Sequence, residues 1–264
     1  MLTDASVATL HVESVGDGPP LVLLHGWALH GGLFSPIVPS LARQHRVHAV
    51  DLPGHGYSDP LRPWTLERVV ESLERRFEDA GALSVLGWSL GGAVALAWAH
   101  RVPLRISRLV LVSTTPKFIA AGDWPHAMTA DTLVRFADEL RVAFKPTLLR
   151  FLTLQVQGSD EGRATLAALR HQLFSRGEPD PAMLADALAS LRSIDLRDDV
   201  RHIRQPSLVV TGARDTLAPP QAGAWLAQAL PAGRLHSLAG AAHAPFLSHR
   251  DAFLEVALPF LRNG

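Results

Sequence analysis

Residues 86–92, which read Leu-Gly-Trp-Ser-Leu-Gly-Gly, constrain the fold of this chain more than any other stretch. The apolar run Leu83–Trp88 has the length and composition of a buried strand, and the alanine-rich segment Gly91–Arg101 has those of a helix. Between them, a G-x-S-x-G pattern centred on Ser89 predicts a nucleophile elbow. So tight a turn strains the serine backbone and projects its hydroxyl from the sheet edge. The helix N-terminus beneath it favours negative charge.

Strand-like and helix-like segments alternate on both sides of this turn. The expected strands are Val7–Val15, Leu21–Leu24, Val47–Val50, Leu83–Trp88, Arg108–Ser113, Ser207–Thr211 and Arg234–Leu238. The expected helices are Leu33–Arg43, Thr65–Asp79, Gly91–Arg101, Pro219–Leu230 and Asp251–Leu261. This alternation predicts an α/β fold with a mostly parallel sheet and helices on both faces.

The alternation stops in the middle of the chain. From about residue 115 to about residue 195 only amphipathic helical segments occur: Thr132–Ala143, Pro146–Gln157, Asp160–Phe174 and Pro181–Ile194. Ligands of such sheets bind at the carboxyl ends of the strands, so we interpret this block as an inserted helical cap that roofs the site. The expected division is therefore a core of residues 1–114 and 196–264 with a cap of residues 115–195.

A serine hydroxyl is a weak nucleophile and needs a base that is itself oriented by an acid. In this architecture the partners follow in the order Ser, Asp or Glu, His, each after a strand. Asp215 follows one predicted strand and His243 follows the last, after small residues that allow a close approach to Ser89. We therefore predict a catalytic triad of these three residues. The rival acids precede a strand and are expected to be solvated turn residues: Asp195, Asp198 and Asp199.

The oxyanion formed during such a reaction needs two backbone donors. One is expected from the N–H of Leu90, directly after the nucleophile, and the other from the N–H of Trp27, after the strand that ends in Leu24. The side chains of Trp27 and Trp88 flank Ser89 in this interpretation and are expected to line the substrate pocket, with Phe151 from the cap.

Composition and missing motifs exclude several other chemistries. The 264 residues include no cysteine, which rules out disulfides, thiolate metal sites and a cysteine nucleophile. The sequence contains no phosphate-binding or dinucleotide-binding glycine motif and no H-E-x-x-H, so we expect no cofactor and no metal. The formal net charge is zero, so we expect no nucleic-acid or membrane partner. Residues 1–4 show no basic region followed by an apolar block, so we expect no signal peptide, and we expect the chain to be a soluble, cytoplasmic monomer.

Several short motifs, taken together, carry a resemblance to a known family. They are Leu24–Trp27, Val50–Gly54, Leu86–Gly92, Asp123–Pro125, Ser193–Arg197 and Ala241–His249. Over essentially its whole length the chain resembles the α/β-hydrolase superfamily, and within it these motifs resemble the BioH family, the pimeloyl-[acyl-carrier protein] methyl ester esterases of biotin synthesis. The resemblance implies a serine esterase that removes methanol from the carrier-bound ester. Its triad falls residue by residue on Ser89, Asp215 and His243.

The charge pattern of the predicted cap bears on the partner that this resemblance implies. From Arg141 to Arg176 there are six basic and two acidic residues on a chain of zero net charge. Acyl-carrier proteins are acidic, so a basic rim that includes Arg150 and Arg163 would attract them. Two alternatives stay open: a general short-chain esterase or lactonase for small-molecule esters, and a hydrolase-fold receptor with little turnover.

Overall fold

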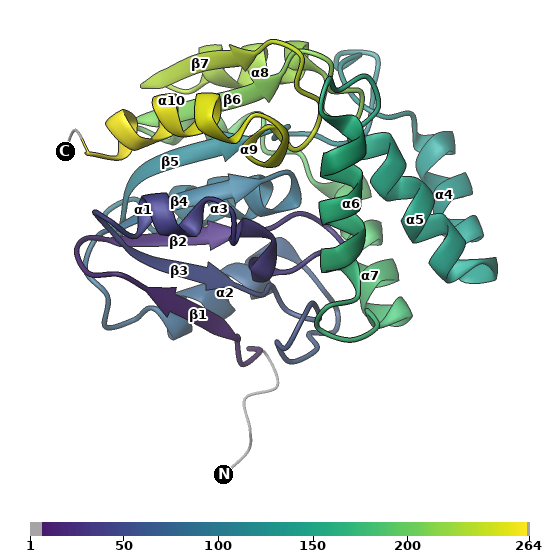
Figure 1. Cartoon of the computed structure of the whole chain (residues 1–264), viewed down its shortest axis with the longest axis horizontal. Coiled ribbons are helices and arrows are strands. Elements are labelled where there is room, and N and C mark those ends of the chain that lie inside the picture. The colour runs from purple at the N-terminus through teal and green to yellow at the C-terminus, as the bar shows by residue number, and fades with distance from the viewer. Residues whose placement is uncertain (1–6, 263–264) are drawn as a thin grey trace.

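A computed structural model describes residues 7–262, so the prediction about a signal peptide, which concerns Met1–Asp4, lies outside the described residues. Its sheet has seven strands in the order β1-β3-β2-β4-β5-β6-β7 (Figure 1). The strands are β1 (Val12–Val15), β2 (Pro20–Leu24), β3 (Arg46–Val50), β4 (Leu83–Trp88), β5 (Ile106–Val112), β6 (Ser207–Gly212) and β7 (Gly233–Leu238). β1 pairs antiparallel with β3, and the other pairs are parallel. The α/β-hydrolase fold expected from the sequence is confirmed.

The register brings the ends of three central strands together. Leu24 of β2 pairs with Gly87 of β4, and Trp88 of β4 pairs with Val112 of β5. Every residue of β4 is buried, as its continuous apolar run predicted for a strand covered on both faces. The turns that follow β2, β4 and β5 therefore meet at one edge of the sheet.

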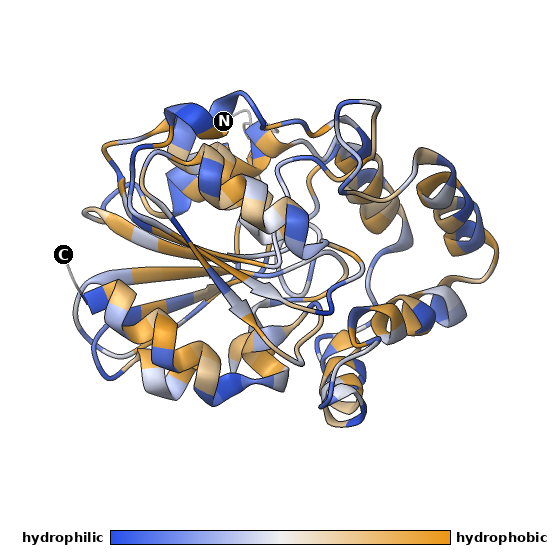
Figure 2. Ribbon diagram, turned by 90° about the horizontal axis from the view of Figure 1, so that it is seen from above, coloured by the Kyte–Doolittle hydropathy of each residue, from blue (hydrophilic) through white to orange (hydrophobic). Residues whose placement is uncertain are grey.

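Helices cover both faces of the sheet (Figure 2). They are α1 (Val38–Leu41), α2 (Leu66–Arg76), α3 (Leu90–Arg101), α8 (Pro220–Ala229), α9 (Pro245–Ser248) and α10 (Arg250–Arg262). The buried small side chains of α3 allow it to pack closely on β4 and β5, and α2 packs against α3. The Thr65 side chain caps α2 by accepting a hydrogen bond from the Arg68 N–H, as its position in the sequence predicted.

Two predicted elements are shorter in the structure. The segment predicted as the helix Leu33–Arg43 forms only a 3₁₀ turn, η1 (Gly31–Phe34), and the four-residue α1. Pro36 and Pro39 lie within it and have no N–H to donate to a continuous helical ladder. The strand predicted over Val7–Val15 begins only at Val12, although Ala8 and Leu10 are buried as an alternating pattern requires.

Four helices between β5 and β6 form what we call the helical cap: α4 (Ala130–Val142), α5 (Phe144–Gln155), α6 (Gly162–Leu173) and α7 (Pro181–Ser193). They lie beyond the carboxyl ends of the parallel strands (Figure 1). The segment leaves and re-enters the core at one place, because Lys117 bridges to Asp195 and the Leu196 N–H donates to the Pro116 carbonyl at 2.9 Å. The predicted domain limits at 115 and 195 fall beside this contact. Within residues 7–262, no helix has the length and apolar character that crossing a membrane requires.

Candidate active site

The turn between β4 and α3 has the geometry of a strained elbow. Ser89 has φ 54° and ψ −116°, a conformation that non-glycine residues rarely adopt. A Cβ on Gly87 would lie 2.4 Å from the Gly91 carbonyl oxygen, and one on Gly91 would lie 2.1 Å from that of Leu24. Only glycine fits at either position, because the backbones of the turn, α3 and β2 touch there.

The side chains of Ser89, His243 and Asp215 form a continuous hydrogen-bonded chain. The Ser89 Oγ lies 3.0 Å from His243 Nε2, and His243 Nδ1 lies 2.8 Å from Asp215 Oδ2. The other carboxylate oxygen, Oδ1, accepts the N–H groups of Leu217 at 2.9 Å and Ala218 at 3.0 Å. His243 and Asp215 are buried, so the acid is fixed on both oxygens and can orient the imidazole.

Two backbone N–H groups beside Ser89 are free to bind an oxyanion. Leu90 is the first residue of α3, and Trp27 lies in the loop after β2; both line the same cavity as Ser89 and His243. Among the residues that the structure describes, neither N–H has a hydrogen-bond acceptor. Two unpartnered donors, one at the N-terminus of α3 and one in the loop after β2, form an arrangement that can stabilise a developing negative charge.

His25 fixes the loop that presents the Trp27 N–H. Its Nδ1 donates to the Gly26 carbonyl at 2.8 Å, and its Nε2 accepts the Leu52 N–H at 2.9 Å. Burial, with a smaller repulsion from His55, lowers the pKa of His25 to about 3. The imidazole therefore stays neutral, which its acceptor role at Nε2 requires.

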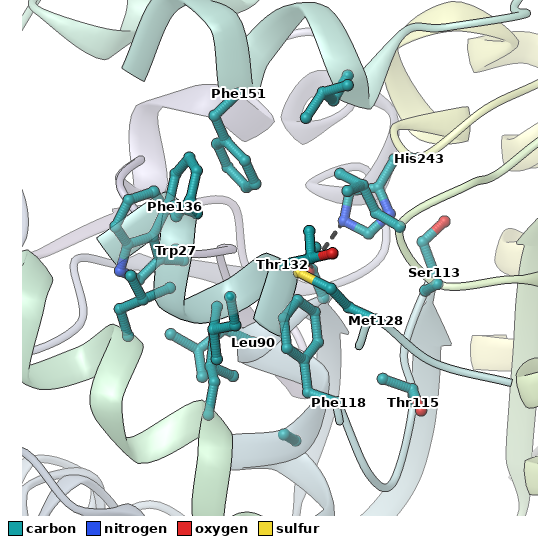
Figure 3. Close-up of a pocket in the computed structure, with 18 of the residues that line it drawn as sticks. Trp27, Leu90, Ser113, Thr115, Phe118, Met128, Thr132, Phe136, Phe151 and His243 are labelled. Carbon is teal, nitrogen blue, oxygen red and sulfur yellow. Dashed lines mark hydrogen bonds between the residues drawn. The ribbon is translucent and has the colours of Figure 1, made fainter. Parts of the chain in front are cut away.

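The serine opens into a cavity of about 200 Å³ between the core and the helical cap (Figure 3). Most of its cap-side wall is apolar and is formed by Leu133, Phe136, Phe151, Leu154, Leu188 and Leu191. The cap also contributes the polar side chains Thr132, Arg135, Glu139 and Arg150 to the lining. The Trp27 ring packs edge-on against Phe151 and Phe136, with distances between ring centroids of 5.1 and 5.6 Å. Its Nε1 donates to the Leu184 carbonyl of α7 at 2.9 Å. The predicted positions of Trp27 and Phe151 at the pocket agree with this geometry. The cavity suits an apolar chain attached to a reactive carbonyl.

The prediction that Trp88 lines the pocket is wrong. Its side chain is buried and is not among the residues that line the cavity. The indole Nε1 donates to the His243 carbonyl at 2.7 Å, and the ring packs on Phe246. Trp88 therefore supports His243 through the backbone carbonyl of that residue.

The structure separates the two arginines that the sequence placed at the substrate site. Arg150 of α5 lines the mouth of the cavity and forms an ion pair with Glu139 of α4. Arg163 of α6 is exposed but does not line the cavity. Direct contact between Arg163 and a substrate inside the cavity is thus not supported, whereas contact with a molecule on the outer face of the cap is compatible with its position.

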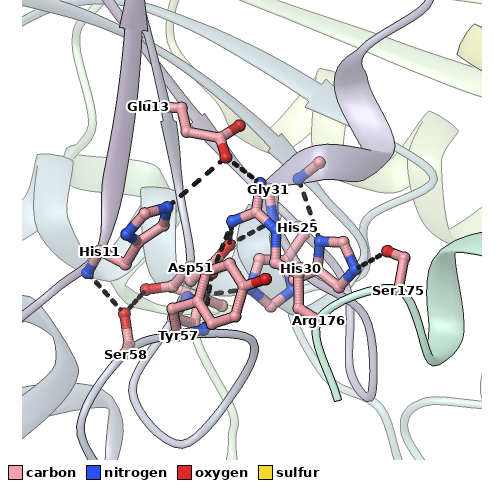
Figure 4. A network of polar contacts seen from close by, with 12 residues as sticks. His11, Glu13, His25, His30, Gly31, Asp51, Tyr57, Ser58, Ser175 and Arg176 are labelled. Carbon is pink, nitrogen blue, oxygen red and sulfur yellow. Dashed lines mark hydrogen bonds and ion pairs between the residues drawn. The ribbon is translucent and has the colours of Figure 1, made fainter.

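Arg176 does not belong to the basic rim, although the count of cap charges included it (Figure 4). Its Nη1 donates to both oxygens of Asp51 at 2.9 and 2.7 Å, and its Nη2 pairs with Glu13. Its side chain is 8% exposed. Arg176 thus fastens the loop between α6 and α7 to β1 and to the residue after β3, instead of facing a partner.

Sequence reasoning missed Ser113, which follows β5 beside the elbow. It has φ 47°, and its buried hydroxyl lines the cavity without a hydrogen-bond partner in residues 7–262. It missed the cap walls Leu133 and Phe136 too, although their spacing of three residues marks one face of a helix. Which face of a cap helix meets the cavity depends on packing between helices that are distant in sequence.

Comparison with known proteins finds chains that are similar to this one in sequence and in structure. The family model described as alpha/beta hydrolase fold matches residues 19–250. A pimeloyl-[acyl-carrier protein] methyl ester esterase of Nitrosomonas europaea is 42% identical, over 94% of this chain and 98% of its own length. A protein of the same name from Chromobacterium violaceum is 44% identical, over 96% of this chain and 98% of its own. An esterase from Exiguobacterium antarcticum has a TM-score of 0.87 at 22% identity, covering 96% of both chains, and this likeness shows the fold alone.

Proposed function

The chain belongs to the family of pimeloyl-[acyl-carrier protein] methyl ester esterases within the α/β-hydrolase superfamily, and on this premise we propose that it hydrolyses the methyl ester of pimeloyl-[acyl-carrier protein] to the free carboxylate and methanol in biotin synthesis. One observation carries the proposal: the array of Ser89, His243 and Asp215 opens into an apolar cavity beside two free N–H groups.

The proposed reaction begins with transfer of an acyl group to the serine. The Ser89 Oγ attacks the ester carbonyl while His243 Nε2 takes its proton, and Asp215 stabilises the resulting imidazolium. The N–H groups of Trp27 and Leu90 hold the negative oxygen of the tetrahedral intermediate. The imidazolium then gives its proton to the departing methoxy oxygen, so methanol leaves and the acyl group stays on Ser89.

Water completes the reaction at the same site. His243 takes a proton from a water molecule, which attacks the acyl carbonyl, and the second tetrahedral intermediate collapses with return of that proton to Ser89 Oγ. The products are the free carboxylic acid and the regenerated serine. His243 mediates every proton transfer in these two stages of the reaction.

The carrier protein is the finer part of the proposal. The arginines of α6 support it: Arg163 and Arg170 are exposed and have no ion-pair partner among the described residues. The rest of the rim is less available, because Arg150, Lys145 and Arg141 pair with acidic neighbours. We therefore propose that an acidic carrier docks over α6 and sends its acyl chain past Arg150 into the cavity. A monomeric, cytoplasmic enzyme stays a prediction.

The test is the release of methanol from pimeloyl-[acyl-carrier protein] methyl ester, compared with p-nitrophenyl butyrate and a simple lactone. We expect kcat/KM for the carrier-bound ester to be the highest of the three, and we expect the gene to restore growth without biotin to a strain that lacks its own pimeloyl-ester esterase. Turnover of the small substrates without turnover of the carrier-bound ester would favour a general esterase or lactonase. Binding without turnover of any ester would favour a receptor.

A further inference from the structure

One turn of the helical cap contacts both loops that carry the proposed acid and base. This turn, residues 155–160, joins α5 to α6. We propose that it is a positioning element for His243, so that the cap helps to assemble the triad in addition to shaping the pocket. The inference rests on the proposed serine-esterase mechanism, and no residue of the turn needs to touch the substrate.

The first set of contacts joins the turn to the loop of the histidine. The His243 N–H donates to the carbonyl of Gln155, the last residue of α5, at 3.0 Å. Five residues further on, the Asp160 N–H donates to the Gly240 carbonyl, again at 3.0 Å. Gln155 is 1% exposed, so this end of the cap is packed into the molecule. The loop from Gly240 to His243 is therefore hydrogen-bonded to the cap at both of its ends.

The second set joins the same turn to the loop of the acid. The Arg214 side chain donates from Nη1 to the Gly158 carbonyl at 2.8 Å and forms an ion pair with Asp160. Arg214 directly precedes Asp215, and its own N–H donates to the Ala241 carbonyl at 2.9 Å. A single side chain thus links the cap turn to the acid loop, and the backbone links the acid loop to the histidine loop.

These contacts complete the support of His243. Its carbonyl accepts from Trp88 Nε1 at 2.7 Å, its Nδ1 donates to Asp215 at 2.8 Å, and its N–H is held by Gln155. The remaining polar atom, Nε2, faces the Ser89 hydroxyl at 3.0 Å. Of these three supports, Trp88 and Asp215 belong to the core, and Gln155 belongs to the cap. Because a displacement of about 1 Å can cost about 100-fold in rate, loss of the cap support should lower catalysis.

The experiment removes the linking side chain without touching the pocket. Arg214 and Asp160 are 49% and 58% exposed, so their ion pair should contribute little to folding stability. In Arg214→Ala we expect kcat for p-nitrophenyl butyrate to fall about tenfold, with KM changed by less than about twofold and little change in Tm. Asp160→Ala should lower kcat in the same direction, and Arg214→Lys should recover most of the loss.

A matched control is available in a second ion pair between core and cap. Asp186 of α7 pairs with Arg62 at 2.8 Å and lies away from both triad loops. Asp186→Ala should therefore leave kcat unchanged, although it removes the same kind of contact as Asp160→Ala. Arg214→Ala and Asp160→Ala together also distinguish a loss of positioning from an electrostatic effect on His243. A field effect on His243 would move the rate in opposite directions when a cation or an anion is removed, whereas loss of support lowers it in both.

Three results would overturn the inference: wild-type kcat in both Arg214→Ala and Asp160→Ala, opposite effects of the two, or an equal loss in Asp186→Ala. If Arg214→Ala does not fold, Asp160→Ala and Arg214→Lys decide the question. Failure of the proposed serine-esterase mechanism looks different, because the wild-type protein would then hydrolyse no ester at all. A general esterase that rejects the carrier-bound ester would leave this test with p-nitrophenyl butyrate intact.

Discussion

At Ser89 a strained backbone and a reactive group coincide. The φ of 54° is maintained because β4, α3 and two glycines leave the residue no other conformation. The motif G-x-S-x-G was sufficient to predict this turn, since its glycines are required by local contacts. The unpartnered hydroxyl of Ser113 could not be predicted in the same way, because its burial depends on the cap above it.

Replacement of the serine tests the nucleophile. Ser89→Ala removes the only atom that forms the covalent intermediate, so turnover of p-nitrophenyl esters should disappear while the fold is retained. The measurement is kcat, with circular dichroism and Tm as the check on folding. A residual kcat above about a thousandth of the wild-type value would contradict the assignment.

The acid is tested by comparing two aspartates. Asp215→Asn should lower kcat by about four orders of magnitude, because an amide at this position favours the wrong histidine tautomer. Asp195 instead pairs with Lys117 and Arg197 at the base of the cap, so Asp195→Asn should have a much smaller effect on kcat. If Asp195→Asn gave the slower enzyme of the two, the acid would have to be reassigned.

At the scale of elements, local signals in the sequence predicted the cap helices well. α7 begins at Pro181 behind the capping side chain of Asp180, and both residues are recognisable in the sequence. The prediction of a helix over Leu33–Arg43 is wrong because Pro36 and Pro39 interrupt the helical hydrogen bonding that the apolar spacing favours. The predicted role of Trp88 in the pocket is wrong because a residue next to Ser89 in sequence need not face the cavity, and Trp88 is buried against Phe246 and the His243 carbonyl.

Charge reversal on the cap tests the docking of a carrier protein. In the double variant Arg163→Glu and Arg170→Glu, which leaves the cavity lining untouched, kcat/KM for the carrier-bound methyl ester should fall at least about tenfold, mainly through slower association. The wild-type value should fall as salt is raised to about 0.5 M, where the screening length is about 4 Å. Turnover of a free p-nitrophenyl ester should barely change in either experiment. Equal losses on both substrates would mean that these arginines support the pocket, and no loss on either would remove the charge-based support for docking.

At the scale of the whole molecule, buried histidines couple folding to pH. Burial lowers the pKa of His25 to about 3 and that of His55 to about 4. In the unfolded chain both titrate near 6.5, so between pH 6.5 and 4 the unfolded state binds protons that the folded state does not. The free energy of unfolding should therefore be unaffected by these two histidines above about pH 6.5 and should decrease as the pH falls below it. Each group contributes a slope of up to about 1.4 kcal/mol per pH unit.

Unfolding in urea at pH 7, 6 and 5 measures this dependence. His55→Gln keeps a donor for the Pro53 carbonyl and removes the titration, so its stability should fall less steeply with pH than that of the wild type. His171→Gln, at an exposed position on α6, is the matched control and should keep the wild-type slope. Identical slopes in all three proteins would show that His55 does not contribute.

The bridge between Lys117 and Asp195 means that the cap begins and ends at adjacent points of the core. An insertion with adjoining ends can be exchanged without stretching the scaffold that receives it, so grafting a cap from a related hydrolase is a practical route to a new substrate range. The contacts of residues 155–160 set a condition on that exchange. A grafted cap would have to carry its own replacement for the Gln155 carbonyl, or the recipient would gain a new pocket and lose the alignment of its histidine.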